Sequence, residues 1–279
     1  MVYRVEDLDG PRVVAGTADA QAATLRRLGM DWDEGPDIDG PNGPYFQSAR
    51  GAFYDEALRR LAQQGRLFPC RVSRRELAGV ASAPHGPEGP PYPASLRPPA
   101  PAPGWLDDPA TQRDAAIRFR VDDGPVEVED RVAGRFTEDV RQTVGDFVLR
   151  RRDQSFAYQL AVVVDDLAMG VTEVVRGRDL LSSTARQLLL IRALGGQPPT
   201  YAHVPMVVNA AGEKLSKRNA AAGVDEILDA GVPVDDVVGW LAWALGQQDA
   251  PAPMTAGAVA GVWSWALVRA DPVIVPMWT

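Results

Sequence analysis

A proline-rich segment near the middle of the chain is the feature that most constrains the fold. From residue 83 to residue 109 the sequence is dominated by Pro, Gly and Ala, as in PHGPEGPPYPASLRPPAPAPG. Proline lacks a backbone N–H and fixes φ, so such a segment cannot form a regular helix or a central strand. We therefore predict an extended loop here, which either interrupts one domain or joins two.

Hydrophobic patterns on both sides of this loop predict alternating helices and strands. The apolar run 155–164 stands directly before Asp165 and Asp166 and suits either a strand or a helix that is buried on several sides. Strands are predicted at residues 2–5, 116–121 and 171–177, and helices at residues 18–28, 49–64, 180–194, 224–230 and 234–245. This order indicates an α/β fold with a sheet of parallel character.

Composition limits the classes of protein to consider. The 279 residues are 46% hydrophobic, which is enough for a sizeable core in one large or two modest domains. The net charge of −8 means that any contact with nucleic acid must use a local basic patch. Cys70 is the only cysteine, and no stretch resembles a signal peptide or a membrane span, so we expect a cytoplasmic protein.

The loop at residues 212–219, GEKLSKRN, carries two lysines and a serine close together. Flexible ammonium groups can follow the negative oxygens of a triphosphate as charge redistributes in a transition state. Lys214, Ser216 and Lys217 are therefore candidate nucleotide ligands. The alternative is a solvated basic turn, because so short a string has little specificity of its own.

Seven blocks, in this order, resemble the catalytic domain of the glutamyl-tRNA synthetases, and together they span most of residues 4–218. The blocks are residues 4–12, 28–36, 45–48, 146–151, 156–166, 170–181 and 214–218. Because 61 residues follow Arg218, too few for the usual anticodon-binding region, the chain is more similar to the truncated glutamyl-queuosine tRNA(Asp) synthetases.

The resemblance implies a Rossmann-like class I synthetase domain with an inserted subdomain and a short helical C-terminal region. It divides the chain into a first catalytic half at 1–69, an insertion at 70–130, a second half at 131–218 and helices at 219–279. It also implies a monomeric ligase that uses ATP with Mg²⁺ to activate L-glutamate and transfers it to the queuosine base of tRNA(Asp). The alternatives are an impaired remnant that only binds glutamate, nucleotide or tRNA, or an enzyme with a non-tRNA acceptor.

The resemblance assigns site residues position by position. Lys214, Ser216 and Lys217 would bind ATP, and the two lysines would act in catalysis. Glu6 would receive the amino group of glutamate, while Tyr158 and Arg176 would bind the rest of the amino acid. A guanidinium can grip a carboxylate with two parallel hydrogen bonds, which would reject glutamine. Without the resemblance, Glu6 could instead be a solvated acid, Tyr158 a core aromatic and Arg176 an ordinary salt-bridge residue.

The sequence departs from the family at its N-terminus. The family begins with a strand, a turn resembling RFAPSPTG and a HIGH-type motif that opens a helix under the phosphates, and Met1 aligns after these parts. His85 and His203 do not lie in a HIGH-like context, so we expect the first to be solvated and the second to pack near the lysine loop. The sequence alone leaves two interpretations, a misassigned start codon or a degenerate remnant.

A second departure concerns zinc. The family's insertion commonly has the pattern C-x-C followed by Y-x3-C, whose thiolates can supply a tetrahedral shell. Cys70 and Tyr92 match this pattern, but Val72 and Leu96 occupy the other two positions. We therefore predict that no zinc is bound and that Cys70 is a small buried hydrophobic residue.

Overall fold

The computed structural model describes residues 1–10, 13–73, 76–77, 90–215 and 223–275. Its strands form an antiparallel sheet in the order β1-β2-β5, a mixed sheet in the order β4-β3-β7-β6 and a small sheet of β8 and β9. The strand bounds are β1 Leu67–Cys70, β2 Ala116–Phe119, β3 Val126–Asp130, β4 Gly134–Glu138, β5 Phe147–Arg150, β6 Glu173–Gly177, β7 Thr200–Val204, β8 Val207–Val208 and β9 Val273–Ile274.

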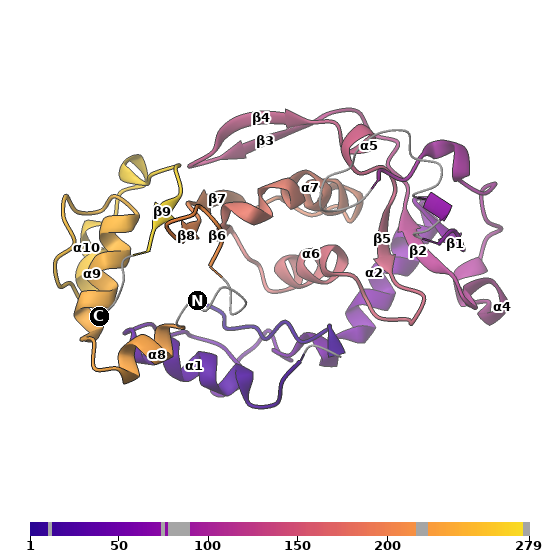
Figure 1. The fold of residues 1–279 in the computed structure, drawn as a ribbon. Helices are drawn as coiled ribbons and strands as arrows, with labels where there is room; N and C mark the ends of the chain where they lie inside the picture. Colours follow the sequence, from indigo (N-terminus) through magenta and orange to yellow (C-terminus); the bar gives the residue numbers. More distant parts are fainter. Residues whose placement is uncertain (11–12, 74–75, 78–89, 216–222, 276–279) are drawn as a thin grey trace.

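Helices fill the space between the sheets and form the C-terminal end of the molecule (Figure 1). The α-helices are α1 Thr17–Arg27, α2 Gly51–Gln63, α4 Pro109–Gln112, α5 Val140–Thr143, α6 Tyr158–Ala168, α7 Thr184–Ala193, α8 Val224–Asp229, α9 Val234–Ala244 and α10 Ala256–Val262. Short 3₁₀ helices lie at Gln47–Ala49, Ala94–Leu96, Trp105–Asp107, Arg178–Ser183 and Trp265–Leu267. None of the helices within the described ranges is long and apolar enough to cross a bilayer.

The main core lies where α6 meets α2 and α7, and it continues into the antiparallel sheet. Leu160 and Ala161 of α6 are completely buried, and Val162, Val163 and Val164 are nearly so. The run 155–164, for which the sequence left strand or helix open, therefore contributes to a helix that is apolar on almost every side. Packing outweighs the modest cost of three β-branched residues in that helix.

The mixed sheet contains one strand–helix–strand unit that matters for the site. Strand β6 runs parallel to β7, and α7 connects them across the core. Strand β7 also pairs in parallel with β3, whereas β4 pairs with β3 antiparallel. The predicted sheet of parallel character is thus mixed, and the strand 116–121 lies in a separate antiparallel sheet, which also joins 67–70 to 147–150.

The predicted strand at residues 2–5 is wrong. Val2 and Val5 each form one isolated bridge, to Glu34 and Phe46 respectively. The backbone N–H of Tyr3 donates to Glu34 at 2.8 Å, whereas that of Val5 donates to Tyr45 at 2.8 Å. Because the segment pairs with two different stretches in succession, no continuous ladder forms.

The remaining element predictions agree with the structure to within a few residues. Helices α1, α2, α7, α8 and α9 lie where the periodicity places them, and strands β2 and β6 fall inside their predicted ranges. The proline-rich segment, where described, contains two 3₁₀ turns, an isolated bridge from Tyr92 to Gly145 and the first residue of α4, Pro109. Its residues 83–89, with His85, lie outside the described residues.

Candidate active site

Glu6 lies beside an arginine that the sequence analysis did not single out. The Glu6 side chain is 42% exposed, and its Oε1 accepts a hydrogen bond from Arg4 Nη2 at 3.1 Å. Arg4 Nη1 also donates to Asp166 Oδ1 at 2.8 Å. Arg4 and Glu6 line a hollow of about 760 Å³ whose wall also includes Phe46. The hollow gives a polar ligand room to reach the Glu6 carboxylate.

Neighbouring negative charges keep the Arg4 guanidinium protonated. Burial alone would lower the pKa of Arg4, but the charges of Asp166 and Glu6 outweigh it and raise that pKa. Burial is also the main cause that raises the pKa of Asp166, against the opposing effect of Arg4. Arg4 is therefore a permanent cation that holds Glu6 in place.

Next to Arg4, whose Nε lies 3.9 Å from Asp165 Oδ2, a buried polar cluster surrounds Asp165. The Asp165 carboxylate is completely buried and accepts hydrogen bonds from Arg50 Nε at 2.6 Å, Gln47 Nε2 at 2.8 Å and the Tyr54 hydroxyl at 2.8 Å. Arg50 is itself buried. This cluster ties α6 to α2 and to the turn before it, so it supports the segment that presents Arg4 and Glu6.

Tyr158 is the first residue of α6 and is partly buried. Burial raises the pKa of its phenol, the negative charge of Glu6 raises it further, and the positive charge of Arg176 opposes both. The phenol therefore stays protonated at neutral pH. The two charge effects place Tyr158 within electrostatic range of both other predicted glutamate ligands, of which Glu6 lines the hollow.

Arg176 lies on β6, directly opposite His203 of β7 in the parallel register. Its Nε–H donates to His203 Nε2 at 2.9 Å, and its Nη2 donates to Thr184 Oγ1 at 3.0 Å and to the Leu180 carbonyl at 3.3 Å. The guanidinium also lies over the Tyr201 ring, 5.5 Å from its centroid, in cation–π range. The side chain is thus held on one edge by its neighbours.

His203 is completely buried between Arg176 and Asp130. Its Nδ1 lies 2.5 Å from Asp130 Oδ2. A guanidinium only donates, so His203 Nε2 must accept, and the ring proton lies on Nδ1 facing the carboxylate. The expected packing of His203 near the lysine loop stays a prediction, because its hydrogen bonds go to Arg176 and Asp130. These partners could not be predicted, because strand register cannot be read from a single sequence.

The lysine loop is only partly described. Lys214 forms an isolated bridge with Val208, and its ammonium group pairs with Asp179 at the surface. Asp179 lies in the 3₁₀ helix that follows β6, so this ion pair links the loop to the end of the strand that carries Arg176. Ser216 and Lys217 lie outside the described residues. The assignment of all three to ATP stays a prediction.

The four positions of the family's zinc pattern come together in space as an apolar cluster. Phe68, Cys70, Leu77 and Tyr92 are buried there, with Val72 and Leu96 packed against them. The Cys70 thiol donates to the Tyr92 hydroxyl at 3.6 Å, and that hydroxyl donates to the Leu96 carbonyl at 2.9 Å. A single thiol and a phenol that is already hydrogen-bonded do not fit zinc, which needs four donors. Within the described ranges, no three His, Cys, Asp or Glu residues are grouped to hold a metal.

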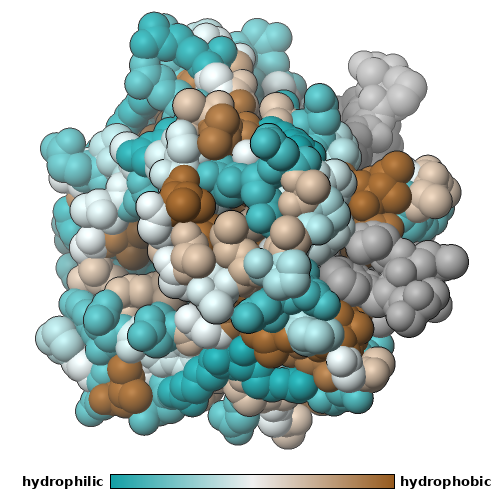
Figure 2. All heavy atoms as spheres, turned by 90° about the vertical axis from the view of Figure 1, so that its left-hand side faces the viewer, coloured by the Kyte–Doolittle hydropathy of each residue, from teal (hydrophilic) through white to brown (hydrophobic). Residues whose placement is uncertain are grey.

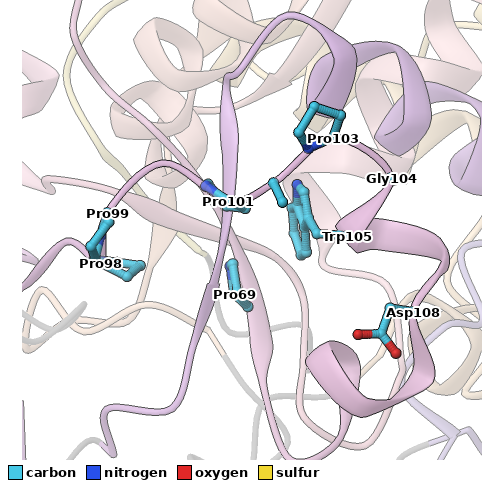
Figure 3. A pocket seen from close by; sticks show the side chains of 9 residues that line it. Pro69, Pro98, Pro99, Pro101, Pro103, Gly104, Trp105 and Asp108 are labelled. Atoms are coloured by element: carbon cyan, nitrogen blue, oxygen red, sulfur yellow. The ribbon is translucent and has the colours of Figure 1, made fainter.

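A second hollow of about 350 Å³ lies on the proline-rich segment, far along the chain from the candidate ligands. Figure 3 shows Pro98, Pro99, Pro101 and Pro103 around it, with Trp105 at its centre and Asp108 at its rim. Its lining is mostly apolar, and Asp108 is the only charged residue among those that line it. It therefore lacks the pair of opposite charges that a zwitterionic amino acid would meet.

Comparison with known proteins relates this geometry to a family. The family model for "tRNA synthetases class I (E and Q), catalytic domain" matches residues 1–234. The chain belongs to this family. A glutamyl-Q tRNA(Asp) synthetase of Symbiobacterium thermophilum is 43% identical over 99% of this chain and 85% of the relative. A protein of the same name from Geobacter sulfurreducens is 44% identical, over 99% of this chain and 82% of the relative.

Solved structures of glutamate-tRNA synthetases have the same fold as this chain. A glutamate-tRNA synthetase from Elizabethkingia anophelis superimposes with a TM-score of 0.82 at 24% identity, and 99% of this chain is covered. The chain spans 61% of the length of that structure. A glutamate tRNA ligase from Elizabethkingia meningosepticum gives the same TM-score at 23% identity. The predicted α/β class I catalytic fold is therefore confirmed.

Proposed function

We propose that the chain activates L-glutamate with ATP and transfers the glutamyl group to the queuosine base in the anticodon loop of tRNA(Asp). The observation that carries this proposal is the grouping of Glu6, Tyr158 and Arg176 in a chain whose relatives bear the name glutamyl-Q tRNA(Asp) synthetase. One carboxylate, one protonated phenol and one guanidinium complement the charges of an acidic amino acid.

Each group would meet a different part of glutamate. The Glu6 carboxylate, oriented by its hydrogen bond from Arg4, would bind the ammonium group. Arg176 would bind the side-chain carboxylate, and Tyr158 would donate a hydrogen bond to an oxygen of the amino acid. Glutamine presents an amide NH₂ where glutamate presents a second oxygen, and a guanidinium has no acceptor for it. We therefore expect selectivity for glutamate.

Activation joins a carboxylate to a phosphate. An oxygen of the α-carboxylate attacks the α-phosphorus of ATP, a mixed anhydride forms, and pyrophosphate leaves. The reaction needs orientation and stabilisation of charge on the phosphates more than proton transfer. Lys214, Ser216 and Lys217 would supply that charge and hydrogen bonding, and Mg²⁺ would arrive with ATP as part of the substrate. Transfer of the glutamyl group then releases AMP.

The acceptor is the finer part of the proposal. With a net charge of −8, the protein has no overall attraction for RNA, so tRNA(Asp) must be recognised through local contacts. We propose that the protein acts as a monomer in the cytoplasm.

Labelled glutamate and two forms of one tRNA test the proposal. Purified protein receives ATP, Mg²⁺ and tRNA(Asp) with or without queuosine. We expect glutamate-dependent exchange of pyrophosphate into ATP, and label only on the queuosine-containing tRNA. Equal label on both tRNAs, or exchange with no label on either, would favour a different acceptor. Glutamate binding without exchange would identify a remnant that only binds.

A further inference from the structure

We infer that Asp130 and His203 are positioning residues that orient the Arg176 guanidinium for the side-chain carboxylate of glutamate. The inference rests on the proposed function and adds to it the reason why Arg176 points where it does. The three residues come from three neighbouring strands, β3, β7 and β6, and their hydrogen bonds connect each strand to the next.

The neighbours of Arg176 hold its guanidinium through Nε and Nη2. His203 Nε2 accepts from Nε, and Thr184 Oγ1 accepts from Nη2, while the two acceptors lie 3.4 Å apart. Nε and Nη2 present parallel N–H bonds on the same edge of the planar group. Among the described residues no acceptor is recorded for Arg176 Nη1. These contacts fix the plane of the guanidinium. Because Nη2 also donates to the Leu180 carbonyl at 3.3 Å, Nη1 is the nitrogen that remains available to a carboxylate.

His203 can do this only as a neutral ring. Burial lowers its pKa, and so do the positive charges of Arg176 on β6 and Arg178 in the turn after it, against the raising effect of Asp130 on β3. Thr184 and Tyr201, its other polar neighbours, carry no charge at neutral pH. The ring therefore offers Nε2 as an acceptor, because Asp130 holds the proton on Nδ1.

Asp130 is in turn fixed by its own loop. Its Oδ1 accepts from the backbone N–H of Ala133 at 2.7 Å and of Val132 at 2.9 Å. Burial alone would raise the pKa of Asp130, but these hydrogen bonds and the one from His203 hold it below its ordinary value. Asp130 thus stays an anion that accepts the Nδ1 proton. A carboxylate that orients a histidine in this way selects its tautomer.

The test replaces Asp130 by asparagine, which keeps the shape and removes the charge. An amide can donate to Nδ1, which would move the ring proton to Nε2 and turn the Arg176 partner from an acceptor into a donor. We expect Asp130→Asn and His203→Gln to raise KM for glutamate about 10- to 100-fold, the range for losing a charged hydrogen bond. KM for ATP and kcat should change much less. Glu129→Gln, one residue away on β3 and exposed, is the matched control and should behave as wild type.

A second readout does not depend on activity. The chain has only two histidines, so ¹⁵N NMR of labelled histidine resolves His203 directly. We expect Nδ1 protonated and Nε2 bare in the wild type at neutral pH, and the reverse tautomer in Asp130→Asn. A wild-type ring protonated on Nε2 would overturn the inference. So would an unchanged KM for glutamate in both variants of an active enzyme.

Failure of the inference and failure of the proposed function give different results. If the wild type shows no glutamate-dependent exchange and no glutamate binding, the proposed function is wrong, and the inference fails with it. If the wild type is active and only the variants leave KM unchanged, the inference alone is wrong. If His203→Gln fails to fold, Asp130→Asn carries the kinetic test.

Discussion

Two buried carboxylates in this protein are connected to arginines in different ways. Asp165 contacts Arg50 directly, and both side chains are buried. Asp130 reaches Arg176 only through the neutral ring of His203, and Arg176 is partly exposed. A direct pair neutralises the arginine and closes the cluster. An interposed imidazole orients the arginine but leaves its charge available to a ligand. The first arrangement is suited to support and the second to binding.

The largest expected effect comes from breaking the closed cluster. Asp165→Ala leaves the buried Arg50 guanidinium without its counter-ion and removes the acceptor for Gln47 and Tyr54. We expect a loss of about 3–5 kcal/mol in the free energy of unfolding, the typical result of leaving one partner of a buried pair uncompensated. Urea denaturation followed by circular dichroism measures it. Glu129→Ala, whose pair with Arg135 is exposed on both sides, is the control, and a comparable loss there would contradict the argument.

Breaking the open arrangement should affect binding more than stability. Arg176→Ala removes the proposed partner of the glutamate side chain, so we expect affinity for glutamate to fall about 10- to 100-fold. Arg176→Lys keeps the charge but lacks the planar fork, and it should recover only part of the loss. Calorimetric titration of glutamate measures both, with Arg135→Ala as an exposed control. An unchanged affinity in Arg176→Ala would remove this residue from the site.

The sequence could predict features that depend on local patterns or on the resemblance, but not contacts between residues far apart in the chain. The roles of Glu6, Tyr158 and Arg176 stay predictions, which the resemblance assigns one by one. Most helices were predicted correctly because their apolar periodicity is strong. Arg4 stands in the first matched block, yet nothing in the sequence says that it contacts Glu6 and Asp166. His203 and Asp130 are 73 residues apart, and only the register of β3, β7 and β6 joins them. Long-range pairings of this kind are invisible to local patterns.

The errors have physical causes as well. The segment 2–5 has the residues of a strand, but its backbone donates to two separate stretches, and a strand needs one continuous partner. The run 155–164 was ambiguous because a fully buried helix and a fully buried strand have the same apolar pattern. Some apolar side chains near the C-terminal end are exposed, among them Val262, Leu267 and Ile274. Figure 2 shows apolar side chains scattered among polar ones on this side of the molecule.

Acidification gives a third way to separate the two regions. The pKa of His203 is lower in the folded protein than its ordinary value, mainly because of burial, so the unfolded chain binds a proton first as pH falls. Stability from this residue is therefore complete above pH 6.5 and declines as pH drops from there towards the folded pKa. The slope cannot exceed one proton, about 1.4 kcal/mol per pH unit.

Urea midpoints between pH 8 and pH 5 measure this slope in the wild type and in His203→Gln, which lacks the titrating ring. We expect the slope between pH 6.5 and pH 5 to be shallower in the variant. A second loss should appear only in more acidic buffer, as Asp130 is protonated, because the pKa of that carboxyl is lowered. Identical slopes in the two proteins would show that His203 titrates normally and is not held neutral.

The smallest expected effect is on the link between the lysine loop and β6. Asp179 pairs with Lys214, and the two side chains are 39% and 60% exposed, so solvent screens their attraction. Asp179→Ala should change the free energy of unfolding by less than about 1 kcal/mol. Its effect on KM for ATP should stay within a factor of about five, which is the same free energy, and should favour ATP because Lys214 loses a competing anion. Pyrophosphate exchange at varied ATP measures this. A marked rise in KM for ATP would instead mean that Asp179 positions the loop, and the site would then depend on two oriented cations, Arg176 and Lys214.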